Sequence, residues 1–130
     1  MPLIRIDVVE GRRTPEQVTL LLDTVHTEMV SAFETPARDR YQIVHEHPRH
    51  QLVVQDTGLG FERTDDVVMV QVTSRPRDRG KKEAFYSGLV DALERECGLR
   101  PEDLVVSITE NTDEDWSFGH GRAQFLTGDL

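Results

Sequence analysis

Pro2-Leu3-Ile4-Arg5-Ile6-Asp7-Val8-Val9 is the stretch of sequence that decides the fold. Ile4, Ile6 and Val8 occupy every second position, which is the period of a strand that buries one of its two faces. The same alternation returns 64 residues later in Val68-Met69-Val70-Gln71-Val72. The sequence therefore predicts two equivalent strands, one opening each half of the chain.

The two halves share more than these strands. Met1–Glu46 can be laid on Asp65–Glu110 without a gap, and the shared pattern is one of residue character rather than identity. In each half the strand is followed by a helical spacing of apolar residues, within Glu16–Phe33 and again from Phe85 to Cys97. A loop and a closing strand complete each half. The closing strands are expected at Tyr41–Glu46 and Val105–Glu110.

Each half is thus predicted to be a β-α-β unit, whose two strands run parallel across a right-handed helical crossover. We predict an α/β (α+β) fold in which the tandem units form a four-stranded, mainly parallel sheet with two helices on one face. Residues 1–130 are interpreted as a single domain with a C-terminal tail at 111–130. The uncovered face of the sheet needs a partner, and a second subunit is the simplest one. Between the halves, Gln51–Val54 is expected to be a short strand or arm, and Asp56–Phe61 a turn.

Composition limits the classes of function. The chain has 15 basic and 24 acidic residues, a formal net charge of −9, and no basic block, so nucleic acid is not an expected partner. No stretch approaches the ~20 apolar residues of a membrane span, and no signal peptide is evident, which predicts a cytoplasmic protein. Cys97 is the only cysteine, so no internal disulfide is expected. With Gly98 after it, we interpret Cys97 as a structural thiol at a helix end.

Two arginines form a candidate anion site. Arg75 and Arg77 flank Pro76 at the carboxyl end of the strand expected at Val67–Thr73. Residues two apart in an extended segment point the same way, so both guanidinium groups could bind one small carboxylate through forked hydrogen bonds. The alternative is an exposed turn with surface salt bridges.

Asp39 is a candidate acid or base. It stands between Arg38 and Arg40, just before the second strand, where it could accept a proton or hold a water molecule. The alternative is a structural turn cap, because Asp103 occupies the matching place in the second half.

Pro2 is a candidate catalytic amine. Initiator methionine is normally removed before proline, which would leave a secondary amine fixed at the end of a strand. An α-amino group titrates near ~7.7–8.0, so its surroundings decide whether it acts as a base or as a cationic acid. If Met1 were retained, the nitrogen of Pro2 would be a tertiary amide without a basic lone pair, and this hypothesis would fail.

The histidines and glycines do not point to a cofactor. His26, on the expected first helix, is interpreted as a partly buried structural histidine. His45, His47 and His50 lack a cysteine partner and are interrupted by Pro48, so no metal site is expected. The glycines at 58 and 60 precede a strand instead of linking a strand to a helix, which argues against a nucleotide site.

These features together resemble the tautomerase superfamily, whose members use an amino-terminal proline, and within it the malonate semialdehyde decarboxylases. The resemblance spans the chain, and its most specific part is the tail. The segments that carry it are Met1-Pro2-Leu3, Asp39-Arg40-Tyr41-Gln42, Asp56-Thr57-Gly58-Leu59-Gly60, Ser74-Arg75-Pro76-Arg77, Ala92-Leu93-Glu94-Arg95, Asp115-Trp116-Ser117-Phe118-Gly119 and Phe125-Leu126-Thr127-Gly128-Asp129-Leu130.

The resemblance implies a homotrimer that converts malonate semialdehyde to acetaldehyde and carbon dioxide without metal or cofactor, and that also hydrates acetylenic acids. It implies that Pro2 is the cationic acid, that Asp39 keeps it protonated or activates water, and that Arg75 and Arg77 bind the carboxylate. Further residues would line the substrate pocket as an apolar wall. These are Trp116, Phe118 and Phe125.

Other functions remain open on the sequence alone. One is a hydratase, dehalogenase or keto-enol tautomerase that acts on another small unsaturated acid. Another is a non-catalytic trimer that only binds a carboxylate. A Schiff base between neutral Pro2 and the aldehyde is the rival mechanism.

Overall fold

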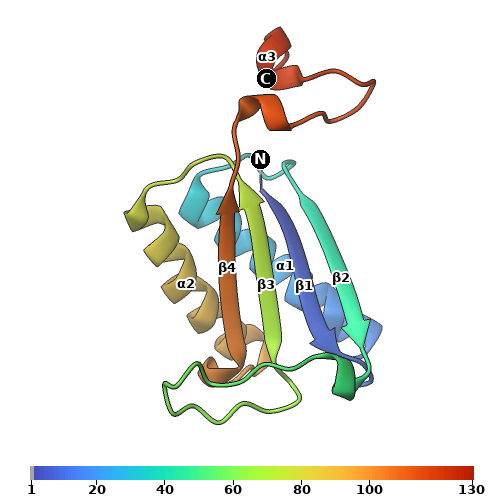
Figure 1. Cartoon of the computed structure of the whole chain (residues 1–130), viewed down its shortest axis with the longest axis vertical. Coiled ribbons are helices and arrows are strands. Elements are labelled where there is room, and N and C mark those ends of the chain that lie inside the picture. Colours follow the sequence, from blue (N-terminus) through green and yellow to red (C-terminus); the bar gives the residue numbers. More distant parts are fainter. Residues whose placement is uncertain (1) are drawn as a thin grey trace.

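The computed structural model describes residues 2–130, which form one four-stranded sheet with two long helices (Figure 1). The strands are β1 (Leu3–Val9), β2 (Tyr41–His47), β3 (Val68–Ser74) and β4 (Leu104–Glu110). The long helices are α1 (Pro15–Phe33) and α2 (Arg79–Cys97). Short helical turns complete the chain at Arg49–Gln51, Pro101–Asp103, Asp113–Asp115 and, as α3, Gln124–Thr127.

The sheet has the order β2-β1-β3-β4 and is mixed. β1 pairs with β2, and β3 with β4, in parallel, as the β-α-β prediction requires. The two halves meet through β1 and β3, which run antiparallel with Ile6 opposite Val70. The start of β1 therefore lies at the same end of the sheet as the finish of β3. We call this the proline end, and the other the opposite end.

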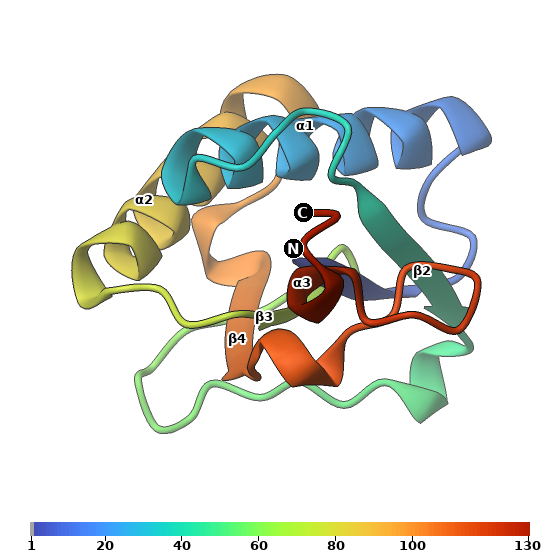
Figure 2. The ribbon, with the colours of Figure 1, turned by 90° about the horizontal axis from the view of Figure 1, so that it is seen from above.

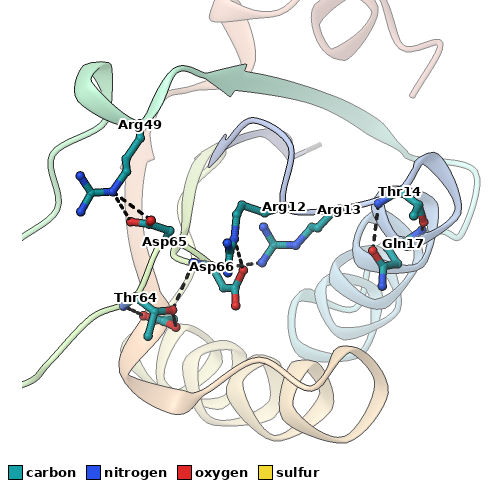
Figure 3. Close-up of polar contacts among 9 residues, drawn as sticks. Arg12, Arg13, Thr14, Gln17, Arg49, Thr64, Asp65 and Asp66 are labelled. Atoms are coloured by element: carbon teal, nitrogen blue, oxygen red, sulfur yellow. Dashed lines mark hydrogen bonds and ion pairs between the residues drawn. The ribbon is translucent and has the colours of Figure 1, made fainter.

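Local sequence signals set the ends of both long helices. Thr14 caps α1 by accepting a hydrogen bond from the backbone N–H of Gln17, and the Gln17 side chain accepts one from the Thr14 N–H (Figure 3). Asp78 caps α2 by accepting from the N–H of Lys81. α2 ends at Gly98, whose φ of 66° is a left-handed conformation that glycine adopts without strain.

The core lies between the sheet and the two helices, which cover the same face (Figure 1). The inward residues of the two central strands are almost wholly inaccessible, and the helices contribute the large side chains that fill the layer. The fully buried members include Ile4, Ile6, Val8, Val68, Val70, Val72, Leu21, Val25, Met29, Phe85, Leu89 and Leu93. The predicted sheet, with both helices on one face, is confirmed.

The gap-free overlay of the two halves is wrong in the closing strands. Gln42 pairs with Ile4, whereas Leu104 pairs with Val68, so β4 follows its partner two residues sooner than β2 does. The reason is a shorter loop between α2 and β4. Of the two interpretations of Gln51–Val54, a short strand or an arm, the strand is wrong: Gln51 ends the helical turn that starts at Arg49, and residues 52–54 have no regular secondary structure.

Among the residues that the structure describes, no helix combines the length and apolar character needed to cross a bilayer.

Leu89 provides a test of the core. It is fully buried on α2, so Leu89→Ala removes packing that the surroundings cannot fully replace. We expect a loss of about 2–5 kcal/mol in the free energy of unfolding, measured by denaturant titration at fixed protein concentration. The matched control is Leu20→Ala on α1, where the leucine is 42% exposed. A comparable loss in both variants would contradict this assignment of the core.

Candidate active site

Pro2 is buried at the proline end of the sheet, between two other parts of the chain. Its neighbour Leu3 pairs with Tyr41 of β2 on one side and with Thr73 of β3 on the other. Pro2 therefore lies between the residues that enter β2 and those that leave β3, the places of Asp39 and Arg75. Figure 2 shows the start of the chain and the C-terminal tail together at this end. Met1, whose removal the catalytic hypothesis requires, lies outside the described residues.

Asp39 is held in a tight turn just before β2. Its N–H donates to the carbonyl of Pro36 at 3.0 Å, and Nε2 of His26 donates to the carbonyl of Ala37 at 2.8 Å. Asp39 is only 7% exposed. Burial raises the pKa of its carboxyl, while the positive fields of Arg75, Arg77 and His26 act in the opposite direction.

His26 thus has the structural role expected of it, because it fastens the turn that carries Asp39. Asp103 lies in a matching turn at the opposite end, where its N–H donates to the carbonyl of Arg100 at 2.9 Å. Its carboxylate accepts hydrogen bonds from the N–H and hydroxyl of Thr64, and so anchors the segment that leads into β3.

Arg75 follows β3 and is tied to the tail. Its Nη1 donates to Oδ1 of Asp113 at 3.0 Å, and its Cζ lies 3.9 Å from the ring centroid of Phe125. The Nε atom is buried and has no hydrogen-bond acceptor among the described residues. This arginine therefore has a donor left over for a ligand.

Arg77 is held by its own loop. Its Nη1 donates to the carbonyls of Arg75 and Pro76, each at 3.1 Å, and its Cζ lies 5.2 Å from the ring centroid of Phe33. Burial and the neighbouring Arg75 lower the pKa of Arg77, against the influence of Asp39 and Glu110. Both predicted arginines are thus at this end, and each donates to a different protein acceptor.

The aromatic residues of the tail form one connected row. Phe118 stacks on Trp116, with ring centroids 5.4 Å apart, and meets Phe125 edge-on at 5.4 Å. On its other side Phe118 stacks on Tyr41 at 5.7 Å. The row joins the start of β2 to Arg75 and brings all three predicted aromatic residues to the proline end.

Sequence reasoning missed three residues of this neighbourhood. Tyr41 opens β2 and extends the aromatic row, and Asp113 pairs with Arg75. Glu110 closes β4, accepts from the N–H of Arg77 at 2.8 Å and lies 3.3 Å from the Lys82 ammonium. The hydrogen bond from Arg77 is the main reason that the pKa of Glu110 is lowered. Only Asp113 lies in the tail, whose richness in Asp and aromatic residues is a weak signal for such a contact, and no sequence pattern indicates the contacts of Tyr41 and Glu110.

His45, His47 and Cys97 have contacts outside this neighbourhood. His47 donates from Nε2 to Asp7 at 2.6 Å, and His45 lies 3.8 Å from the same carboxylate, on the sheet face away from the helices. Within residues 2–130, no three His, Cys, Asp or Glu side chains gather as a metal site would require. Cys97 ends α2, and burial raises the pKa of its thiol.

The geometry suits the chemistry of a small acid. A cationic pair can hold a carboxylate, a buried carboxyl lies close to it, and an aromatic ring of the tail packs on Arg75. A free amine at Pro2 would complete the set with a group that can donate or accept a proton.

Known proteins resemble this chain in both sequence and structure. Two family models, each described as a tautomerase enzyme, match residues 39–119 and 2–62. "Probable tautomerase YrdN" of Bacillus subtilis (strain 168) is 53% identical over 130 residues, which is 100% of both chains.

Solved structures are similar over almost the whole chain. A malonate semialdehyde decarboxylase, solved in wild-type, mutant and inactivated forms to explain its decarboxylase and hydratase activities, is 52% identical with a TM-score of 0.96, covering 98% of each chain. FG41 malonate semialdehyde decarboxylase inhibited by 3-bromopropiolate is 38% identical with a TM-score of 0.93, covering 98% of this chain and 97% of that one.

A symmetric trimer of fused 4-OT shares the fold at 20% identity and a TM-score of 0.78, covering 97% of this chain and 98% of that one. Together with the matched models, these likenesses show that the chain belongs to the tautomerase family.

Proposed function

We propose that this protein is a cofactor-independent decarboxylase that converts malonate semialdehyde (3-oxopropanoate) to acetaldehyde and carbon dioxide. The observation that carries the proposal is the placement of Pro2 between Asp39 and Arg75 beneath the aromatic row of the tail. The 52% identity to a malonate semialdehyde decarboxylase over 98% of the chain supports the choice of substrate.

The reaction needs an electron sink. When the bond between the carboxylate carbon and C2 breaks, its electron pair moves into the carbonyl and forms the enolate of acetaldehyde. A proton then adds at C2 to give acetaldehyde. Cationic Pro2 stabilises the developing negative charge on the carbonyl oxygen, because this interaction strengthens as the charge grows.

Arg75 and Arg77 bind and orient the carboxylate. The bond between the carboxylate carbon and C2 overlaps the carbonyl π system when the carboxylate is rotated out of the carbonyl plane. A guanidinium that holds the carboxylate through two hydrogen bonds can fix this orientation. The two arginines also lower the pKa of a nearby amine. Asp39, through its negative charge, opposes them and keeps Pro2 protonated.

The site residues Trp116, Phe118 and Phe125 exclude water and strengthen these electrostatic interactions. The same set also serves a promiscuous hydration of acetylenic acids, in which Asp39 activates a water molecule. A homotrimer, which would cover the sheet face left open by the helices, completes the proposal (Figure 1).

The alternative is a hydratase, dehalogenase or tautomerase that acts on another small unsaturated acid with the same Pro2 and arginines. Parallel assays with malonate semialdehyde, 2-oxo-3-pentynoate and 3-haloacrylates distinguish these activities. Carboxylate binding with no turnover of any of them would instead favour a non-catalytic trimer.

Pro2→Ala tests the catalytic amine. We expect kcat/KM for malonate semialdehyde to fall by about 10²-fold or more, because a positioned proton donor typically contributes that much. Mass spectrometry must first show that Met1 is absent from both proteins. Pro48→Ala, at the far end of β2, is the matched control and should retain activity. Full activity in Pro2→Ala, or in wild type that retains Met1, would overturn the proline mechanism.

Asp39→Asn tests the source of the positive charge. Removal of a nearby negative charge lowers the pKa of an amine. The alkaline limb of the plot of kcat/KM against pH should therefore move to lower pH by about one pH unit. The pKa of ¹⁵N-labelled Pro2 should fall in parallel. An unchanged limb in an otherwise folded variant would assign Asp39 to the turn alone.

Asp113→Asn tests the competition for Arg75. Asp113 and the substrate carboxylate need the same guanidinium, so loss of the Asp113 charge should lower KM by about two- to fivefold with kcat little changed, as expected for a partly exposed ion pair. Glu114→Gln in the same helical turn is the control. A raised KM in Asp113→Asn would mean that Asp113 helps binding instead of competing with it.

A further inference from the structure

The opposite end of the sheet repeats the framework of the proline end. Arg77 directly precedes the N-cap of α2, and Arg13 directly precedes the N-cap of α1, 64 residues earlier. The 64-residue period also places Asp66 in the position of Pro2. Since β1 and β3 run antiparallel about Ile6 and Val70, these two sets lie at opposite ends of the sheet in equivalent positions.

Asp66 accepts hydrogen bonds from both arginines at the opposite end (Figure 3). Oδ1 of Asp66 accepts a hydrogen bond from Nε of Arg12 at 2.8 Å, and its backbone carbonyl accepts one from Nη2 of Arg13 at 2.7 Å. The residue in the position of Pro2 is therefore in direct contact with the arginine in the position of Arg77.

A pocket of about 240 Å³ opens beside these groups. Its lining includes the charged residues Arg12, Arg13 and Asp66, and Leu20 and Leu99 contribute apolar surface. Such a lining fits an anion with a short hydrocarbon chain.

Arg13 has hydrogen-bonding capacity that the protein does not use. Its Nη1 is buried and has no acceptor in the part of the chain that the structure describes. The other acidic residue lining the pocket, Glu96, lies 3.2 Å from Arg95, so it does not serve Arg13. Burial lowers the pKa of Arg13, and the opposing negative charge of Asp66 does not fully offset this loss of hydration.

We propose that this pocket is a second carboxylate site that the chain itself blocks in part, because the Asp66 carboxylate takes the Arg12 contact that an external carboxylate would use and leaves Nη1 of Arg13 without an acceptor among the described residues. Removal of the Asp66 side chain opens the pocket to small monocarboxylates, which bind between Arg12 and Arg13. Guanidinium forks match carboxylates in shape and charge, which decides the class of ligand. The inference does not depend on the reaction proposed at Pro2.

The test is chemical rescue by propanoate. All proteins carry Arg75→Gln and Arg77→Gln, so that the proline end contributes no carboxylate binding. In this background, Asp66→Ala should unfold at a lower temperature than its parent. Propanoate at ten times its dissociation constant should then raise the unfolding temperature by about 5 °C relative to chloride of equal ionic strength. The parent should show no such rise.

Two controls make the test specific. Asp65→Ala frees Arg49, which is 76% exposed at its side chain, and should give no saturable stabilisation by propanoate. Adding Arg13→Gln to Asp66→Ala should abolish the rescue. If Asp66→Ala fails to fold, Asp66→Ser removes the charge and most of the side chain, and the ¹⁵Nε resonance of Arg12 should shift saturably with propanoate. Absence of saturable binding in both Asp66 variants, equal rescue in Asp65→Ala, or rescue that survives Arg13→Gln would overturn the proposal.

Discussion

β1 and β3 run antiparallel at the centre of the sheet with Ile6 opposite Val70, and the site at the proline end follows from this pairing. It brings the first residues of the chain next to the residues that follow β3. If the two β-α-β units had paired in parallel instead, Pro2 and Arg75 would lie at opposite ends of seven-residue strands. At about 3.3 Å per residue, that separation exceeds the reach of an arginine side chain.

The sequence predicted the elements well but not their relative direction. Alternation at Ile4, Ile6 and Val8 specifies which face of β1 is buried, and helical spacing together with Thr14 and Gly98 specifies the helices. Neither signal depends on whether a neighbouring strand runs parallel or antiparallel. The direction is set by long-range packing of the halves, which a local pattern does not encode.

The site was predictable to the extent that its residues adjoin strand ends. Pro2, Asp39 and Arg75 each flank a strand, so their meeting follows once the sheet is known. Asp113 lies in the tail and Tyr41 stacks on Phe118 of the tail, a segment that has no counterpart in the repeat and no periodic pattern. Their partners depend on how the turns at 111–124 direct the chain, and on single contacts such as Trp116 Nε1 to Asn111 Oδ1 at 2.7 Å.

Internal carboxylates recur at both ends of the sheet, with different consequences. Asp66 is nearly half exposed at its side chain and pairs with Arg12, whose hydrogen bond lowers the pKa of its carboxyl. That pair favours folding while Asp66 is ionised, and its contribution is lost as the pH falls through the folded-state pKa.

The contribution of Asp39 to stability changes with pH in the opposite direction. Because burial raises the pKa of Asp39, its contribution to stability is present while the carboxyl is protonated and is lost as the pH rises through the folded-state pKa. A residue that costs stability when it is charged is retained more readily where its charge serves a function. A protonated Pro2 beside it would offset that cost, so the two groups favour each other's ionised forms. In that arrangement the positive charges of Arg75 and Arg77 would favour ionised Asp39 and disfavour protonated Pro2, so the negative charge of Asp39 would be needed to keep Pro2 cationic.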